Sequence, residues 1–306
     1  MCILFATRAH PDYKLILLSN RDEFFERKTH STCWNHNGFI LSPYDMAIEK
    51  KGQGYGTWLG INRRGRIAVI LNLKIDSLLD SESVSVTGEP RSRGIVPLQF
   101  LQQEDNALFD NWDSWEKFNG QHGNLRRTGP FTLFYGDVKS DEYNVIDYLK
   151  HSTNPFKKKE HMVISNDIFH CAVGEHTSRW NKTEYGYVLL DALSKNTTGF
   201  PKEELLQKCF ELLSNHTFND GEDVESVTTS SIYVPPLRIT KGADAIGTSL
   251  PIGDYYGTRS QIVILVDKDN RVTYEEHVIY ESDEDCETYS FMDPKEVIQF
   301  QFKIES

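Results

Sequence analysis

The sequence predicts a layered α+β fold, built from many strands and a few helices. The chain contains many short apolar strand patterns and only a few amphipathic helix patterns. Strands and helices do not alternate regularly, as they would in a parallel α/β fold. With 39% hydrophobic and 12% aromatic residues, a chain of 306 residues can bury a large core. We therefore expect a single domain over residues 1–306.

The first twenty residues predict a β-hairpin. Residues 2–8 and 14–20 are apolar on both faces, which is typical of strands covered on both sides. The segment 10–13, His-Pro-Asp-Tyr, supplies the turn, because Pro restricts φ and Asp bonds its own backbone. If residues 9 and 14 close the turn, the numbers of paired residues add up to 23. Cys2 then lies opposite Arg21 and one step from Asp22.

Further strands are predicted where apolar and β-branched residues gather. They lie at 58–61, 66–73, 131–135, 143–149, 161–166, 169–173, 261–266 and 272–279, with a hairpin loop at 267–270. Helices are predicted at 92–103, 183–194 and 202–213, where Leu and Phe recur at helical spacing. We expect surface loops at 215–230 and 281–287, and at 30–36 a loop that leads into a strand.

Composition excludes several classes of function. The net charge of −12 argues against nucleic-acid binding, because phosphate contacts need clustered Lys and Arg. Five cysteines at positions 2, 33, 171, 209 and 286 form no CxxC pair, which favours free thiols in a reducing compartment. No secretory signal is visible, and no apolar run approaches the roughly 20 residues that span a bilayer. We expect a soluble, cytoplasmic protein, for which peripheral membrane association stays open.

Two local patterns are weak evidence for ligand binding. The glycine-rich segment 52–60 lacks the Lys-Ser/Thr of a phosphate-binding loop and continues into a strand. We expect a tight turn that lets backbone approach backbone or a substrate. His30, Cys33 and His36 are spaced by three residues, but no fourth ligand is near them. No metal site is predicted.

Cys2 is the candidate nucleophile of the sequence. If Met1 is removed, Cys2 carries a thiol and a free α-amine, which are a nucleophile and a base in one residue. An α-amine titrates at roughly 7.7 to 8.0 and a thiol near about 8.5, so they can share a proton at neutral pH. Asn72 and Asn166 end apolar strands, where a buried amide either caps a loop or points into a site. With Asp22 and an arginine, these are groups that acyl transfer needs.

Four motifs give the chain a resemblance to a known family. They are Met1-Cys2, Asn20-Arg21-Asp22-Glu23, Gly56-Thr57-Trp58-Leu59-Gly60 and Tyr256-Gly257-Thr258-Arg259. The chain resembles the NRDE family, also called the transport and Golgi organization protein 2 family, over most of its length. That family in turn resembles the N-terminal nucleophile (Ntn) hydrolases of the choloylglycine hydrolase and penicillin V acylase group, which cleave amide bonds with a processed N-terminal cysteine. The resemblance implies a four-layer αββα sandwich of two stacked sheets with outer helices.

The resemblance also implies catalytic roles. Cys2 would be the nucleophile, its α-amine the base, and Asp22 the residue that holds this amine. Asn72 and Asn166 would stabilise the developing oxyanion or position the substrate.

Substrate binding is expected from the same motifs, at Asn20, Arg21, Trp58 and Arg259. The resembling hydrolases place their arginine three residues before the aspartate, whereas Arg21 directly precedes Asp22. Because side chains alternate along a strand, Arg21 and Asp22 are expected on opposite faces, and Arg259 could substitute for Arg21.

Two functions of different classes follow. The first is an N-terminal cysteine hydrolase that acts on amide or acyl bonds of a small or lipid-linked substrate. The alternative is a non-catalytic carrier or trafficking factor on the same scaffold, which handles haem, lipid or acyl-CoA. The family is associated with Golgi organisation, secretion and mitochondria, so association with these organelles stays open. No cofactor is expected, and haem enters only as a bound cargo. A plainer alternative is a structural or regulatory partner protein.

Overall fold

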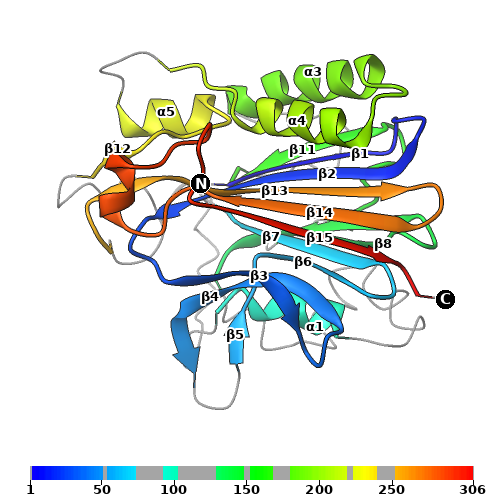
Figure 1. Ribbon diagram of the computed structural model, residues 1–306, viewed down its shortest axis with the longest axis horizontal. Coiled ribbons are helices and arrows are strands. Elements are labelled where there is room, and N and C mark those ends of the chain that lie inside the picture. Colours follow the sequence, from blue (N-terminus) through cyan, green and yellow to red (C-terminus); the bar gives the residue numbers. More distant parts are fainter. Residues whose placement is uncertain are drawn as a thin grey trace. The chain divides into compact units, whose positions relative to one another are not determined.

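The computed structural model describes residues 2–50, 54–73, 92–102, 129–147, 152–167, 180–218, 223–239 and 252–305. Their strands form two antiparallel sheets, with few helices (Figure 1). The predicted α+β fold class is thereby confirmed. The chain divides into two compact units, each built around one sheet: Met1–Ser31, Lys159–Ser165 and Arg179–Ile304 in the first, and Thr32–Lys158, Asn166–Ser178 and Glu305–Ser306 in the second. The single domain stays a prediction.

The sheet of the first unit has the strand order β11-β1-β2-β13-β14-β15, and β12 pairs with β13. Its strands are β1 (Ile3–Thr7), β2 (Tyr13–Phe24), β11 (His161–Ser165), β12 (Leu237–Arg238), β13 (Tyr255–Asp267), β14 (Arg271–Val278) and β15 (Glu296–Lys303). The chain thus places its N-terminal strand inside the sheet, between β11 and β2.

The predicted hairpin register is confirmed. Ile3 pairs with Asn20 and Thr7 pairs with Ile16, so the numbers of paired residues add up to 23. Strand β2 continues to Phe24, beyond the predicted end, because β13 pairs with it over most of its length. On that side Asp22 lies opposite Thr258. The beginning of β1 and the end of β2 therefore lie side by side, at one end of these two strands.

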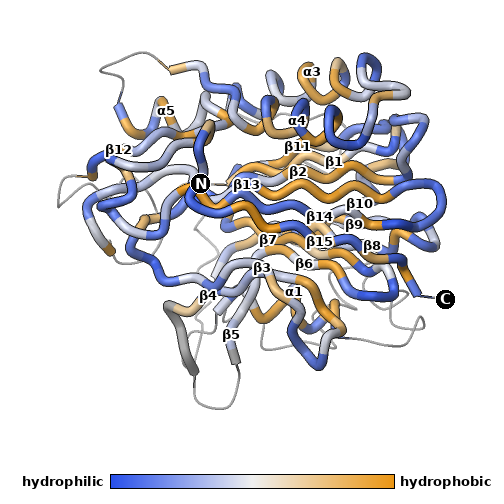
Figure 2. Tube along the Cα trace, in the orientation of Figure 1, coloured by the Kyte–Doolittle hydropathy of each residue, from blue (hydrophilic) through white to orange (hydrophobic). Residues whose placement is uncertain are grey.

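Helices α3 (Asn181–Asn196) and α4 (Lys202–Leu213) pack on this sheet. Their apolar side chains meet Ile3, Phe5 and Leu18 in one buried cluster, and Figure 2 shows the apolar strands beneath the helices. Helix α3 approaches β1 closely, because a Cβ on Gly186 would lie 2.6 Å from Cε1 of Phe5. The predicted bounds of α4 are confirmed, and those of α3 are close.

Two segments expected as surface loops contain helices. Helix α5 spans Val224–Ser230, and a 3₁₀ helix spans Asp283–Glu287. The first begins after Asp223, whose carboxylate accepts a hydrogen bond from the backbone N–H of Ser226. The loop prediction was wrong here because both helices begin at capping residues, Asp223 and Ser282, and bury too few apolar side chains to show a helical spacing.

The sheet of the second unit has the order β10-β9-β8-β7-β6-β4-β3, and β5 pairs with β4. Its strands are β3 (Thr29–Asn35), β4 (Ile40–Lys50), β5 (Gly54–Gly56), β6 (Leu59–Asn62), β7 (Arg66–Asn72), β8 (Phe131–Asp137), β9 (Glu142–Asp147) and β10 (Ser152–Thr153). The loop expected at 30–36 is largely strand β3. The strand expected to follow this segment is β4, although it contains Pro43, a residue that normally argues against a strand interior.

The glycine-rich segment brings backbone against backbone, as predicted. Helix α1 (Ile95–Leu101) packs on the second sheet, and the backbone N–H of Thr57 donates to the carbonyl of Gly94 just before it. A Cβ on Gly56 would lie 2.8 Å from backbone atoms of Gly94. Glycine is therefore required at both positions to let α1 approach the strand.

The strand expected at 169–173 lies outside the described residues. Among the residues that the structure describes, no helix is long and apolar enough to cross a membrane.

Candidate functional site

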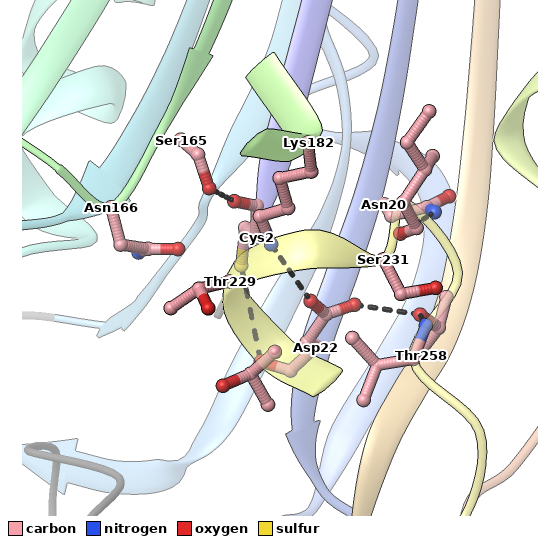
Figure 3. Close-up of polar contacts among 12 residues, drawn as sticks. Cys2, Asn20, Asp22, Ser165, Asn166, Lys182, Thr229, Ser231 and Thr258 are labelled. Carbon is pink, nitrogen blue, oxygen red and sulfur yellow. Dashed lines mark hydrogen bonds and ion pairs between the residues drawn. The ribbon is translucent and has the colours of Figure 1, made fainter. Parts of the chain in front are cut away.

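Cys2 lies at the beginning of β1, with its backbone held by the neighbouring strand. The hydroxyl of Ser165, the last residue of β11, donates to the carbonyl of Cys2 at 2.6 Å. The Cys2 thiol lies 3.9 Å from the backbone carbonyl of Asp22 on β2, within range of a weak S–H hydrogen bond (Figure 3). Neighbouring strands on both sides therefore position the half-buried Cys2.

The environment of Cys2 favours the protonated thiol. Burial raises the pKa of the Cys2 thiol above its ordinary value, and the negative charge of Asp22 raises it further, while Arg21 acts in the opposite direction. A thiol with a raised pKa is a poor nucleophile unless a base takes its proton. Any reaction at Cys2 therefore needs a proton acceptor beside it.

Asp22 is a buried carboxylate held by β13. The hydroxyl of Thr258 donates to Oδ1 of Asp22 at 2.7 Å, and the same hydroxyl accepts the backbone N–H of Val234 at 2.9 Å. The hydroxyl of Tyr256 donates to the backbone carbonyl of Asp22 at 3.2 Å. Because an ionised carboxylate can only accept hydrogen bonds, the Thr258 hydroxyl directs its proton at Asp22.

Lys182, near the start of α3, brings a positive charge to this carboxylate. Its side chain is 0% exposed, and its Nζ lies 4.0 Å from Oδ2 of Asp22. The ammonium group also lies 5.3 Å from the centre of the Trp180 ring, a cation–π contact. Burial lowers the pKa of Lys182, and the negative charges of Asp22 and of the Cys2 thiolate oppose this effect. Figure 3 shows the side chains of Cys2 and Lys182 converging on Asp22.

Arg21 contacts other partners than Asp22. Its guanidinium lies 4.0 Å from Oε2 of Glu23, which is also 3.6 Å from Nε of Arg27. Arg21 and Glu23 are two residues apart on β2, whereas Asp22 contacts Thr258 and Lys182. This is the alternation expected of a strand. The positive charge of Arg21 acts on the Cys2 thiol and lowers its pKa.

Asn20 and Arg259, both expected to bind substrate, make structural hydrogen bonds. The Asn20 amide is fully buried and donates to the carbonyls of Leu213 and Ile232 at 2.8 and 2.9 Å. Arg259 lies at a β-bulge between β13 and β2, and its guanidinium donates to the carbonyls of Tyr280 and Arg27. Both side chains therefore tie the first unit together, and their role in binding stays a prediction.

The remaining predicted residues belong to the second unit. The side-chain amide of Asn166 donates to the backbone carbonyl of Asn72 at 2.5 Å, so the structure brings these two residues together. Oδ1 of Asn166 has no hydrogen-bond partner among the described residues. Trp58 packs against the apolar cluster beneath α1, and its carbonyl accepts from the backbone N–H of Ile70. Catalytic and binding roles of the three residues stay predictions.

Three residues of the site are absent from the sequence prediction: Ser165, Thr258 and Lys182. Ser165 and Thr258 directly precede predicted site residues, so their positions in the sequence could have indicated a place in the site. The sequence indicates Lys182 less clearly. Its spacing of four residues from Gly186 and eight from Leu190 places it on the buried face of α3. A lysine at such a position would have been expected to be solvated.

These observations define an α+β protein with a half-buried cysteine at the start of an inner strand, beside a buried aspartate–lysine pair. The family model of Transport and Golgi organisation 2 matches residues 1–281. An uncharacterized protein of Saccharomyces cerevisiae is 44% identical over 99% of this chain and 100% of the yeast protein. The human transport and Golgi organization protein 2 homolog is 29% identical over 89% of this chain and 88% of the human protein. The chain belongs to the Transport and Golgi organisation 2 family.

Two solved structures are also similar to the chain. The Caenorhabditis elegans ortholog of N-acylethanolamine-hydrolyzing acid amidase has a TM-score of 0.44 and 12% identity over 72% of this chain and 88% of that one. A mutant of the conjugated bile acid hydrolase from Clostridium perfringens has a TM-score of 0.41 and 13% identity over 99% of this chain and 97% of that one.

Proposed function

We propose that the protein is an N-terminal cysteine hydrolase that acts on an amide or related acyl bond of a small or lipid-linked substrate. The observation that carries the proposal is the place of Asp22. Its carboxylate is buried and is oriented by the hydroxyl of Thr258. The backbone carbonyl of the same residue contacts the Cys2 thiol. A fixed negative charge at this position can hold an α-ammonium group at Cys2.

The proposed reaction begins with removal of Met1, which exposes the α-amine of Cys2. This amine takes the thiol proton, and the thiolate attacks the carbonyl carbon of the substrate. Collapse of the tetrahedral intermediate breaks the C–N or other acyl bond, and the α-ammonium returns the proton to the leaving group. Water then hydrolyses the thioester and regenerates the thiol. Asp22 stabilises the α-ammonium in the charged intermediate stages.

The raised pKa of the thiol agrees with this scheme, because it makes the base necessary. The tetrahedral intermediate also needs hydrogen-bond donors for its oxyanion. We assign this role to Asn72 and Asn166, on the resemblance described above.

The test combines mass and activity. Intact-mass measurement of the native chain, before and after a thiol-reactive probe, reports removal of Met1 and the reactivity of Cys2. A panel of N-acyl amides and thioesters is then assayed with Cys2→Ala and with the matched variant Cys286→Ala. We expect loss of hydrolysis in Cys2→Ala only. Full activity of Cys2→Ala, or a native chain that keeps Met1, would refute the proposal.

A lipid carrier is the second candidate, and a groove of the first unit favours it. The groove has a volume of about 510 Å³ and is partly lined by Leu206, Phe210, Phe291 and Met292. The carboxylates of Glu203, Glu211 and Glu275 also line it and disfavour anionic headgroups. A lipid with a neutral or cationic headgroup therefore fits better than haem or acyl-CoA. The names of the human and fruit-fly relatives refer to transport and Golgi organization, and a carrier is consistent with these names.

The carrier is tested by calorimetry with dodecyltrimethylammonium below its micelle concentration, compared with dodecanoate, haem and an acyl-CoA. The variant Met292→Asp changes a side chain of the groove that is 81% exposed, and Val297→Asp is the control at an exposed apolar residue outside the groove. We expect heat only from the cationic amphiphile, reduced in Met292→Asp. No heat from any of the four ligands would exclude a groove that binds a cationic headgroup, haem or an acyl-CoA.

A further inference from the structure

Lys182 places a charge where the fold alone would favour an apolar side chain. The side chain is fully buried, and its Nζ has no hydrogen-bond partner among the described residues. The 4.0 Å separation from Oδ2 of Asp22 is longer than the 2.7 to 3.2 Å that is typical of a direct hydrogen bond. Burying an ammonium group without hydrogen bonds costs several kcal/mol, as an order of magnitude. Lys182 is therefore a candidate for a functional role.

Contacts at the start of helix α3 place this ammonium group. The Thr183 hydroxyl donates to the Trp180 carbonyl at 2.8 Å and closes the first turn, and Gly186 lets the helix approach Phe5 on β1. The Trp180 ring covers the charge. The ammonium group thus has little freedom to leave the Asp22 carboxylate, and Cys2 precedes the strand on which α3 rests.

We propose that Lys182 is a positioning residue of the Cys2 site: its ammonium group shares the Asp22 carboxylate with the α-amine of Cys2 and offsets the negative charge that the thiol meets. This inference rests on the proposed function for the role of Cys2 as nucleophile and for the α-amine that removal of Met1 exposes. Lys182 does not itself take the thiol proton in this scheme.

The electrostatic reason follows from the charges around the thiol. The Asp22 carboxylate disfavours the Cys2 thiolate, and a second, positive charge next to that carboxylate reduces this effect. Other charged or titratable groups that act on Cys2 or Asp22 include Arg21 on β2 and Tyr233 after α5. Arg21 favours the thiolate, and Tyr233 carries no charge at neutral pH, since burial raises its pKa further above its ordinary value of 10.0. Loss of the Lys182 charge should therefore make Cys2 less reactive.

The test measures the rate at which iodoacetamide alkylates Cys2 as a function of pH, located by peptide mass, in the full chain. Lys182→Met removes the charge and nearly keeps the shape, Lys182→Arg keeps the charge, and Asp22→Asn removes the opposite charge. The remaining cysteines are internal controls. Thermal melting shows which variants fold, and Lys182→Gln replaces Lys182→Met if that variant does not fold.

We expect Lys182→Met to move the midpoint of the Cys2 profile upward by about one pH unit and to slow alkylation at neutral pH about tenfold. Asp22→Asn should move the midpoint downward, and Lys182→Arg should restore it towards wild type. An unchanged midpoint in Lys182→Met, or shifts of the same sign in Lys182→Met and Asp22→Asn, would overturn the inference. The alkylation profile needs no substrate. Its failure can therefore be distinguished from failure of the hydrolase proposal, which would show as full activity of Cys2→Ala.

Discussion

Asn20 allows a sharp test of the structural role of the Asn-Arg-Asp-Glu motif. Its amide nitrogen donates to the carbonyls of Leu213, at the end of α4, and Ile232, after α5. The side chain is fully buried, so water cannot replace these donors. The substitution Asn20→Asp keeps the shape, removes both donors and turns a carboxylate oxygen towards two carbonyl oxygens.

The expected cost follows from these two bonds. A buried carbonyl that loses its hydrogen-bond donor costs about 1 to 3 kcal/mol, so the two together cost about 2 to 6 kcal/mol of unfolding free energy. An unfolding entropy of about 2.1 cal/mol/K per residue gives about 1.6 °C per kcal/mol for a chain of this size, so the melting temperature should fall by about 3 to 9 °C. Protonation of the new Asp would restore one donor, so the loss should become smaller at low pH.

Urea unfolding and thermal melting measure this effect. The control is Asn37→Asp, which makes the same chemical change at an exposed residue and should leave stability nearly unchanged. If Asn20→Asp melts with the wild type while ligand binding falls, the structural reasoning is refuted and the predicted substrate role of Asn20 is favoured.

Three further predictions follow from the site and the fold. Thr258→Val keeps the shape but removes the donor to Asp22 and the acceptor for Val234, so urea unfolding should show a loss of about 1 to 3 kcal/mol, which Thr258→Ser should largely avoid. Gly94→Ala places a Cβ 2.9 Å from the backbone of Gly56, and overpacking should cost about 1 to 3 kcal/mol; an unchanged melting temperature would contradict the close approach. Burial lowers the pKa of Lys182 below its ordinary value of 10.5, so between the two values the unfolded chain binds more protons and the unfolding free energy should rise with pH. Urea unfolding at several alkaline pH values should show this rise of the unfolding free energy in the wild type. The same rise in Lys182→Met would contradict its assignment to Lys182.

Much of the fold could be predicted because local patterns and tertiary packing agree. The hairpin register followed from a proline-containing turn and two apolar strands, and the bounds of α4 followed from Pro201 and the spacing of Leu and Phe. Strand β15 was missed because it alternates exposed with half-buried residues at the edge of the sheet. Its place depends on pairing with β14, which is remote from any local signal.

Only the part of the site that depends on strand register could be predicted from the sequence. The register places Cys2 beside the end of β2, so the contact between the thiol and the Asp22 carbonyl could be expected from the sequence. The partners of the Asp22 side chain could not. Thr258 reaches it through the pairing of β13 with β2, and Lys182 through the packing of α3, which begins some 160 residues after Asp22 in the sequence.

By itself, the sequence determined the α+β class, the N-terminal hairpin with its register, and the presence of Cys2 and Asp22 at one edge of a sheet. These features depend on the period-two alternation of a strand and on turn residues, which are local. Only the tertiary structure decided that Asn20 and Arg259 bond to backbone carbonyls and that Lys182 is buried against Asp22. Whether a lysine is buried depends on which face of its helix packs against the sheet and on which charged group lies opposite it. Both depend on contacts between distant parts of the chain.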